Sequence, residues 1–480
     1  MNTLLKLGLG ALGVAGALGV ALFFGWPRGG EVTAIVAEST PAVPAAAERV
    51  SEELAYRLEH ETRRAGERPS AVQALGDLSR LYHANGFLGE AMQCYEGLVV
   101  LDPDQPRWKH RFATILASYG YLEDAVDLWR EARELDPNSV AVRVRLGDAL
   151  LKSNRLAEAA EIYAEARELS PRNPYVLVGL GRVAIEREEW EEAARNLEGA
   201  AERSDYRIGA DLLISVYEKL GQKARALALA RVVQEGSFVD LADPWMDELL
   251  LVCYDAALLA TAGGLEVFRG KLDSGVSLLE RAVHLAPDDP YFRYQLGMAL
   301  LNARQGTAAE EQFRAAIRLK RDLADAWLKL VELHRRRNES QEAQRLLEEG
   351  MLACPESPSM HLAMGELRWK EGKRDAALRH FERSIELRPN EAPAYLLVAR
   401  LHFQEGNMAA GIAATEEALR MEPGNPTALY ILTLHAVRDG TEEEAAKMLG
   451  QLRLHPRVSL DRLTKVESDF AARFGVDPES

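Results

Sequence analysis

Cysteine and catalytic motifs are scarce in this 480-residue chain. Its three cysteines, Cys94, Cys253 and Cys354, lie far apart and form no C-x-x-C pair, so zinc binding and haem attachment have no support. We expect three buried thiols, and a disulfide between two of them is the alternative if the chain is exported. No G-x-S-x-G, H-E-x-x-H or phosphate-loop motif occurs, so we expect no catalytic residues, no metal site and no cofactor.

Positive charge is also in deficit. The chain has 58 Lys and Arg residues against 74 Asp and Glu residues, a net charge of −16. A nucleic-acid groove needs a basic stripe that neutralises phosphates, so we predict no nucleic-acid partner. The 47% hydrophobic and 28% charged shares are typical of a folded body.

Long hydrophobic runs are absent except for one, the uncharged stretch Leu7–Trp26 between Lys6 and Arg28. Twenty helical residues span about 30 Å, the thickness of the hydrocarbon core of a bilayer. A secretory signal has a shorter apolar core with a cleavage site close behind it, and the next plausible site here is near Ala37. We therefore favour an uncleaved membrane anchor over a cleaved signal.

The short, positively charged N-terminal tail favours an orientation with the N-terminus inside. The rest of the chain would then be periplasmic or otherwise extracytoplasmic. Secretion after cleavage of the segment is the alternative.

Small residues recur along the chain at an almost fixed interval. The interval is 34 residues at every step except one of 33 and one of 49. A period in the mid-thirties is typical of stacked helix pairs. It predicts an all-α solenoid of about eleven helix hairpins, interrupted once near residues 234–255. The series is Ala91, Ala125, Ala159, Ala193, Ala226, Gly275, Ala309, Ala343, Ala377, Gly411 and Ala445.

The other residues of the repeat have clear structural uses when the periodic Ala or Gly is numbered position 20. Small residues at positions 8 and 20 let the two helices of a unit cross closely, and bulky residues at 7, 11 and 24 fill the space between helices. Glycine near position 15 permits the left-handed backbone of the turn, and proline at 32 ends the unit. Residues 140–173 carry the fullest set: Leu146, Gly147, Leu150, Ala159, Tyr163, Ala166 and Pro171.

This unit resembles the tetratricopeptide repeat, and with Leu7–Trp26 the chain is similar to bacterial members that have an N-terminal membrane segment. The resemblance covers about residues 72–233 and 256–456. It implies a right-handed superhelix with a concave groove that binds peptides or partner surfaces.

The pattern predicts seven consecutive regions. They are an N-terminal anchor or signal peptide (1–28), a linker (29–47), a lead-in helix (48–71), a first array of five repeats (72–233), an inserted helix or hinge (234–255), a second array of six repeats (256–456), and a capping helix with a tail (457–480).

The inserted segment accounts for the step of 49 residues. Gly236 and Pro244 punctuate it, and Trp245–Tyr254 is expected to form a short helix. One hypothesis makes Trp245 the centre of a hinge or partner-docking element. The favoured alternative is a plug that fills the gap where the regular stacking changes.

The resemblance implies that positions 2, 5, 9, 12 and 13 line the groove, and we call these the inner positions. At positions 5 and 12 the second array is richer in apolar and aromatic residues than the first, where position 5 includes His110 and Val144. Exposed apolar patches and aromatic anchors mark binding surfaces, although bulky residues here also pack between units. The candidate partner-binding residues are Tyr291, Tyr294, Met298, Leu328, Leu362, Trp369, Leu396, Phe403 and Tyr430.

These features favour a non-enzymatic, membrane-tethered scaffold that recruits or assembles protein or peptide partners of an envelope or secretion complex. The alternative is an exported, soluble peptide-binding receptor or chaperone-like protein. No repeat combines Lys at position 5 with Asn at 9, so a clamp for chaperone tails is not expected. Lipopolysaccharide-assembly regulators also join a membrane span to such repeats, but they end in paired C-x-x-C motifs that this chain lacks.

Overall fold

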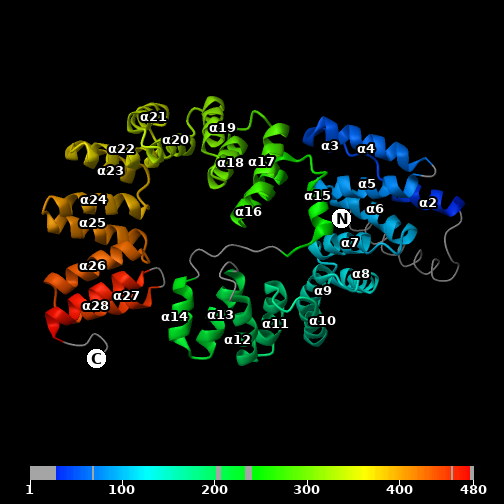
Figure 1. Cartoon of the computed structure of the whole chain (residues 1–480), viewed down its shortest axis with the longest axis horizontal. Coiled ribbons are helices and arrows are strands. Elements are labelled where there is room, and N and C mark those ends of the chain that lie inside the picture. The colour runs from blue at the N-terminus through cyan, green and yellow to red at the C-terminus, as the bar shows by residue number, and fades with distance from the viewer. Residues whose placement is uncertain (1–28, 68–69, 202–206, 233–240, 456–457, 476–480) are drawn as a thin grey trace, which may run out of the picture. The chain divides into compact units, whose positions relative to one another are not determined.

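The structure, a computed structural model, is helical throughout its regular elements (Figure 1). No strand occurs among the residues it describes, which confirms the all-α prediction. None of the helices in those residues is both long and apolar enough to cross a membrane, and the predicted anchor, Leu7–Trp26, lies outside them. The described residues are 29–67, 70–201, 207–232, 241–455 and 458–475.

The helices follow the 34-residue period. The first helix of each pair begins at or next to position 1 of the repeat, often with a proline. Proline suits this place because its fixed φ is helical and its missing N–H is not needed there. The first helices are α5 Ala71–Ala84, α7 Pro106–Ser118, α9 Val140–Lys152, α11 Pro174–Glu186, α13 Arg207–Lys219, α16 Ala256–Phe268, α18 Pro290–Asn302, α20 Ala324–Arg336, α22 Pro358–Lys370, α24 Ala392–Gln404 and α26 Pro426–Asp439. The second helices are α6 Leu88–Leu101, α8 Leu122–Leu135, α10 Leu156–Leu169, α12 Trp190–Ala201, α14 Lys223–Val232, α17 Leu272–Leu285, α19 Gly306–Leu319, α21 Ser340–Ala353, α23 Arg374–Leu387, α25 Met408–Met421 and α27 Glu442–Leu454.

Small residues let the helices of a pair approach closely, as the sequence predicts. At position 20, Ala159 and Ala377 are fully buried. At position 8, a Cβ added to Gly147 would lie 2.7 Å from the ring of Tyr163, which occupies position 24 of the same repeat. The small residue at position 8 therefore makes room for the aromatic ring at position 24.

The turn within each pair uses a left-handed residue at position 15. Ten repeats have a positive φ there, between 58° and 87°. Six of these residues are glycines, whereas Asn154, Glu188, Arg304 and Asn338 adopt the same conformation with a side chain. The last repeat differs, because Gly440 has φ −84° and Thr441 begins α27 with a capping box.

The chain divides into two compact units. Unit 1 comprises Met1–Gly221 and Gly236–Ala286, and unit 2 comprises Gln222–Glu235 and Pro287–Ser480. One boundary falls after Glu235 and the last falls after α17, so most of the insertion belongs to unit 1, and the predicted division into two arrays at 234–255 stays a prediction. The insertion belongs to unit 1 because α15 Pro244–Leu250 packs on α5 and α7, and Arg281 of α17 donates to the carbonyl oxygens of Leu250 and Cys253 at 2.7 and 2.8 Å.

Further helices flank the repeats at both ends. In the region where we expected a linker, α2 Gly29–Ser39 packs against α5 and α6 and buries Val36. We predicted a linker because prolines and alanines follow this stretch, and its apolar face is too short to indicate a helix by itself. α3 Ala46–Val50 and α4 Glu52–Ala65 follow, and near the C-terminus α28 Leu460–Phe474 packs on α26 and α27.

Candidate peptide-binding surfaces

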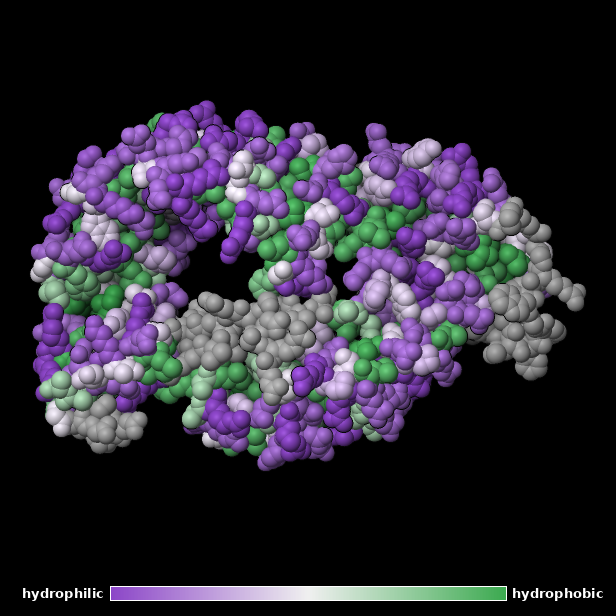
Figure 2. Space-filling model, viewed as in Figure 1, coloured by the Kyte–Doolittle hydropathy of each residue, from purple (hydrophilic) through white to green (hydrophobic). Residues whose placement is uncertain are grey.

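The nine candidate residues of the second array all lie on first helices of unit 2. Tyr291 is 48% exposed, and the other eight side chains are half-buried. Hydrophilic residues cover much of the surface seen in Figure 2, with hydrophobic residues in small groups among them. Each candidate side chain is therefore partly packed within the chain and partly accessible to a partner. The residues around each side chain show which of the two predominates.

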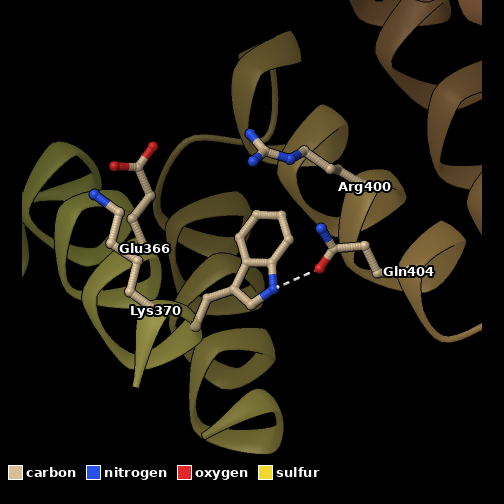
Figure 3. A pocket seen from close by; sticks show the side chains of 5 residues that line it. Glu366, Lys370, Arg400 and Gln404 are labelled. Carbon is tan, nitrogen blue, oxygen red and sulfur yellow. Dashed lines mark hydrogen bonds between the residues drawn. The ribbon is translucent and has the colours of Figure 1, made fainter. Parts of the chain in front are cut away.

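Trp369 lies in a pocket between α22 and α24 (Figure 3). Its indole Nε1 donates to Oε1 of Gln404 at 2.9 Å, and the guanidinium carbon of Arg400 lies 4.5 Å from the ring centroid. Glu366 and Lys370 complete the lining of a cavity of about 460 Å³. An aromatic ring thus forms an apolar wall that is bordered by charged and amide groups.

Two cations of this pocket lack a carboxylate partner. Neither Arg400 nor Lys370 lies within ion-pair distance of an acidic side chain of the described residues, and both are exposed. The ring of Trp369 is fixed, because it stands edge-on to Phe381 with centroids 6.4 Å apart and planes at 85°. The pocket therefore presents free guanidinium and ammonium donors beside a fixed aromatic surface, which suits a carboxylate on an apolar stem.

The two tyrosines of α18 lie elsewhere and differ from each other. The hydroxyl of Tyr291 accepts from Nζ of Lys320 at 2.6 Å, and that ammonium lies 4.9 Å from the ring centroid. Tyr294 packs against the ring of Phe313, with centroids 5.9 Å apart, and burial raises the pKa of its hydroxyl. Tyr291 is accessible, whereas Tyr294 mainly joins neighbouring helices.

Phe403 and Tyr430 also make contacts within the chain. A Cβ added to Gly411 would lie 2.4 Å from the Phe403 ring, so this ring fills the crossing of its own helix pair. Phe403 also borders a second cavity of about 600 Å³ near α26 and α28. The guanidinium of Arg462, on α28, lies 5.2 Å from the centroid of the Tyr430 ring.

The remaining candidates are aliphatic or Met side chains. Leu362 packs against the cluster that contains Phe381, and Leu396 packs against the cluster that contains Ala418. Met298 and Leu328 are half-buried on α18 and α20. Leu362 and Trp369 pack against the same hydrophobic cluster, and Trp369 lines the pocket with Arg400 and Lys370.

Four residues of this pocket were not among those predicted from the sequence. Glu366 and Arg400 occupy position 9 of their repeats, and Lys370 and Gln404 occupy position 13. Positions 9 and 13 both belong to the inner positions, so the sequence already placed these four residues on the groove. Positions 5 and 12, on which the prediction rested, do not include the polar residues that surround Trp369.

Trp245, the other candidate, lies on α15 within unit 1 (Figure 1). Its ring stands edge-on to the ring of His110, with centroids 5.4 Å apart, and its carbonyl oxygen accepts from Nε of Arg111 at 2.8 Å. These contacts hold Trp245 against α7 of the second repeat, and a plug between the fifth and sixth repeats stays a prediction. A hinge or docking role for Trp245 stays a prediction.

A buried polar chain holds the start of α15. Trp129 donates from Nε1 to Nδ1 of His110 at 3.2 Å, so the proton of His110 is on Nε2 and points to Oδ2 of Asp243 at 2.9 Å. Burial by itself raises the pKa of Asp243. The hydrogen bond from His110 and the charge of Arg145 outweigh burial and hold this pKa below its usual range.

Arg111 is completely buried and depends on the same segment. Its Nη2 donates to Oε2 of Glu248 at 2.8 Å, the one carboxylate within ion-pair distance among the described residues. The preceding cation, Lys109, instead pairs with a carboxylate of the repeats themselves, Glu131 of α8, at 2.7 Å.

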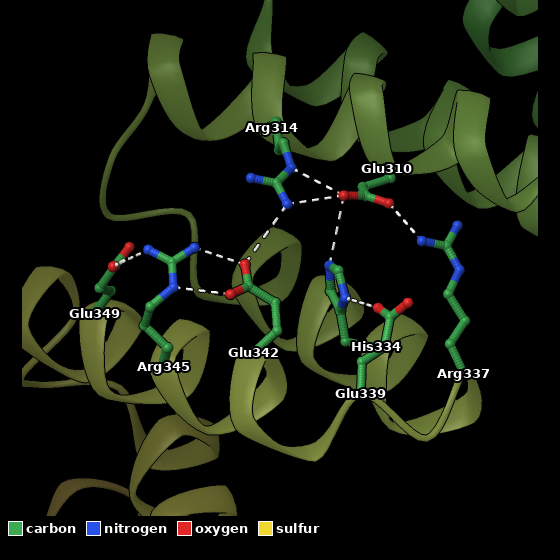
Figure 4. A network of polar contacts seen from close by, with 8 residues as sticks. All are labelled: Glu310, Arg314, His334, Arg337, Glu339, Glu342, Arg345 and Glu349. Atoms are coloured by element: carbon green, nitrogen blue, oxygen red, sulfur yellow. Dashed lines mark hydrogen bonds and ion pairs between the residues drawn. The ribbon is translucent and has the colours of Figure 1, made fainter.

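A second polar network joins consecutive repeats of unit 2 (Figure 4). Glu310 accepts from Arg314 at 2.8 Å and from Arg337 at 2.6 Å, and His334 lies 3.5 Å away. Burial opposes ionisation of Glu310, but these two arginines hold its pKa below the usual range. The carboxylate is saturated by its own chain, so this network stabilises the packing of α19, α20 and α21.

Cys94, Cys253 and Cys354 are each buried and unpaired. Burial raises the pKa of all three thiols, most strongly for Cys94. These are inert packing thiols, as the sequence predicts. In the part of the chain that the structure describes, no group of three His, Cys, Asp or Glu side chains is arranged to hold a metal ion.

Two sequence-family models match the chain, and both are described as tetratricopeptide repeat. One matches residues 262–324, 294–358 and 362–426, and the other matches residues 116–177 and 151–205. Together the matches cover more than half of the chain. No curated protein sequence matches it.

Several solved structures are similar. Yeast Tom70 shares 15% identity, with a TM-score of 0.42, over 86% of this chain and 98% of its own. Cut9, from the APC/C hetero-tetramer Cut9–Hcn1, shares 11% identity, with a TM-score of 0.36, over 89% of this chain and 99% of its own. MamA from Desulfovibrio magneticus RS-1 shares 16% identity, with a TM-score of 0.29, over 35% of this chain and 96% of its own.

Proposed function

Because the chain belongs to the tetratricopeptide repeat family, we propose that it is a non-enzymatic scaffold that binds partner proteins through the inner positions of unit 2. Repeats of this kind present an extended surface for partner binding. The observation that carries the proposal is the pocket at Trp369, where Arg400 and Lys370 have no carboxylate partner in the described residues.

The chemistry of the pocket defines the partner. Its indole wall suits an apolar or aromatic side chain, and its two free cations suit an Asp, a Glu or a terminal carboxylate. We therefore propose that the partner presents an acidic peptide segment with an adjacent apolar residue. The acidic overall charge of the chain repels such a segment elsewhere, so Arg400 and Lys370 also confer specificity.

Photo-crosslinking from position 404 in the full-length protein tests this proposal. A photoreactive residue at Gln404 should capture a defined partner, and Arg400→Glu should abolish that crosslink while helicity and melting temperature stay unchanged. Arg374→Glu is the matched control, because Arg374 is an exposed arginine of α23 outside the pocket. Equal crosslinking in all three proteins would contradict the proposal.

We further propose that Leu7–Trp26 tethers the scaffold to a membrane, with the repeats on the extracytoplasmic side. The length and the lack of charge of this run support the tether. Fractionation of the full-length protein should recover it with membranes after a high-salt wash. Recovery of a soluble form that lacks residues 1–37 would favour the exported alternative.

A further inference from the structure

The segment Leu241–Tyr254 lies along the first helices of unit 1 in the manner of a bound peptide. Leu241 is buried with Val144, which occupies an inner position of α9. Asp243 contacts His110, at an inner position of α7. Tyr254, at the other end, donates its backbone N–H to Asn85 at the end of α5. The segment thus runs from the third repeat back to the first.

Several of its contacts are made through the backbone. Asn85 donates from Nδ2 to the carbonyl oxygen of Val252 at 3.1 Å, and its Oδ1 accepts from the backbone N–H of Tyr254 at 2.5 Å. Arg111 binds the carbonyl oxygen of Trp245. Groups that hold a main chain in this way accept any sequence that presents the same backbone.

The side-chain contacts then define which sequence is preferred. His110 and Arg111 are fully buried, and the acidic groups that meet them, Asp243 and Glu248, come from the segment and not from the repeats. The ring of Trp245 covers His110, and Leu241 enters an apolar cluster. The repeats therefore supply a basic, partly apolar surface, and the segment supplies an acidic, aromatic complement.

We propose that this surface of unit 1 is a second peptide-binding site, which its own segment Leu241–Tyr254 occupies and from which a partner peptide displaces it. The partner peptide carries the pattern Leu-x-Asp-x-Trp-x-x-Glu or its close equivalent. Occupation in cis keeps the site closed, because a tethered segment is present at an effective concentration of order mM. The proposal concerns unit 1 alone and does not depend on the pocket at Trp369.

The test uses the full-length chain and a fluorescein-labelled peptide of residues 241–254. The variant D243N/W245A/E248Q weakens the cis segment and should bind the peptide at least about tenfold more tightly than the unaltered chain does, by fluorescence anisotropy. A peptide with Asn at 243 and Gln at 248 should bind this variant about tenfold more weakly than the unaltered peptide. The control variant D104N/E168Q, which removes two exposed carboxylates of the same unit, should behave as the unaltered chain.

Hydrogen exchange of the same proteins separates an occupant from an essential part of the core. In the triple variant α15 should lose protection, while α5 to α12 keep theirs. Loss of protection throughout α5 to α9 would overturn the proposal, because the segment would then be an obligatory part of the fold. Failure of the peptide to bind the variant would also overturn it, as would dimerisation of the variant in sedimentation, which would assign the site to a second copy.

Discussion

The first helices of the two units differ in what lies against them. In unit 1 the buried cation Arg111 is paired with Glu248 of the chain's own segment. In unit 2 Arg400 stacks on Trp369 at the surface and has no acidic partner in the described residues. The same helix-pair plan therefore serves two purposes. In unit 1 the chain itself pairs the cation, and in unit 2 the cation is available to a ligand.

The largest effect is expected on the free energy of unfolding when each of these two arginines is replaced by alanine. Arg111→Ala should lower the free energy of unfolding of unit 1 by about 3 kcal/mol, because it leaves the Trp245 carbonyl oxygen and Glu248 without their partner. Arg400→Ala should change stability by no more than about 0.5 kcal/mol, since the side chain is exposed. Urea unfolding with hydrogen exchange of α7 and α22 measures both. Equal losses would remove the distinction between the units.

A lower pH should destabilise unit 1 more than unit 2, with a smaller effect than that of Arg111→Ala. Burial, followed by the nearby charge of Arg111, lowers the pKa of His83 in unit 1 to about 4. Its unfolded pKa is about 6.5, so the unfolded chain takes up the proton first. Stability is complete above pH 6.5 and falls as the pH approaches 4, by about 2 kcal/mol at pH 4.5.

Hydrogen exchange of α5 and α6 at pH 7 and pH 4.5 measures this loss, and His83→Gln should largely remove it. In unit 2 the pKa of His380 is also lowered, by burial and then by His361, but His380 is closer to solvent and should contribute less. An unchanged acid response in the His83→Gln protein would show that other groups govern it.

The smallest expected effect concerns a feature that the two units share. Glu188 in unit 1 and Arg304 in unit 2 occupy position 15 with φ of 58° and 60°. Glycine removes the steric cost of this conformation, so Glu188→Gly and Arg304→Gly should each raise stability by about 1 kcal/mol. Thermal unfolding checks this, with Gly372→Ala as the reverse control. A destabilising result in one unit only would show that the repeats are not equivalent at their turns.

The fold was predictable because its signals are local. The small residues at positions 8 and 20 and the left-handed turn at position 15 recur within each repeat, and Gly147 with Tyr163 shows how the spacing becomes a contact. The unit boundary was not predictable in this way. It depends on contacts such as that between Asn85 and Tyr254, which are 169 residues apart in the chain.

The candidate sites were predictable only in part, for a related reason. Trp369 and Trp245 were found because an aromatic residue at an inner position or in an insertion is conspicuous. Arg400 and Arg111 were not, because a charged residue on a helix resembles ordinary solvated surface until its neighbours are known. The stacking of Arg400 on Trp369 and the burial of Arg111 are visible only in three dimensions.

The shared turn conformation at position 15 has a consequence for how such a chain lengthens. Since ten repeats share one backbone shape in the turn between their two helices, a duplicated 34-residue module carries its own turn and forms the same helix pair. Such duplication is unconstrained only where no distant segment contacts the module. The repeats held by Leu241–Tyr254 are therefore fixed in number by the reach of that segment.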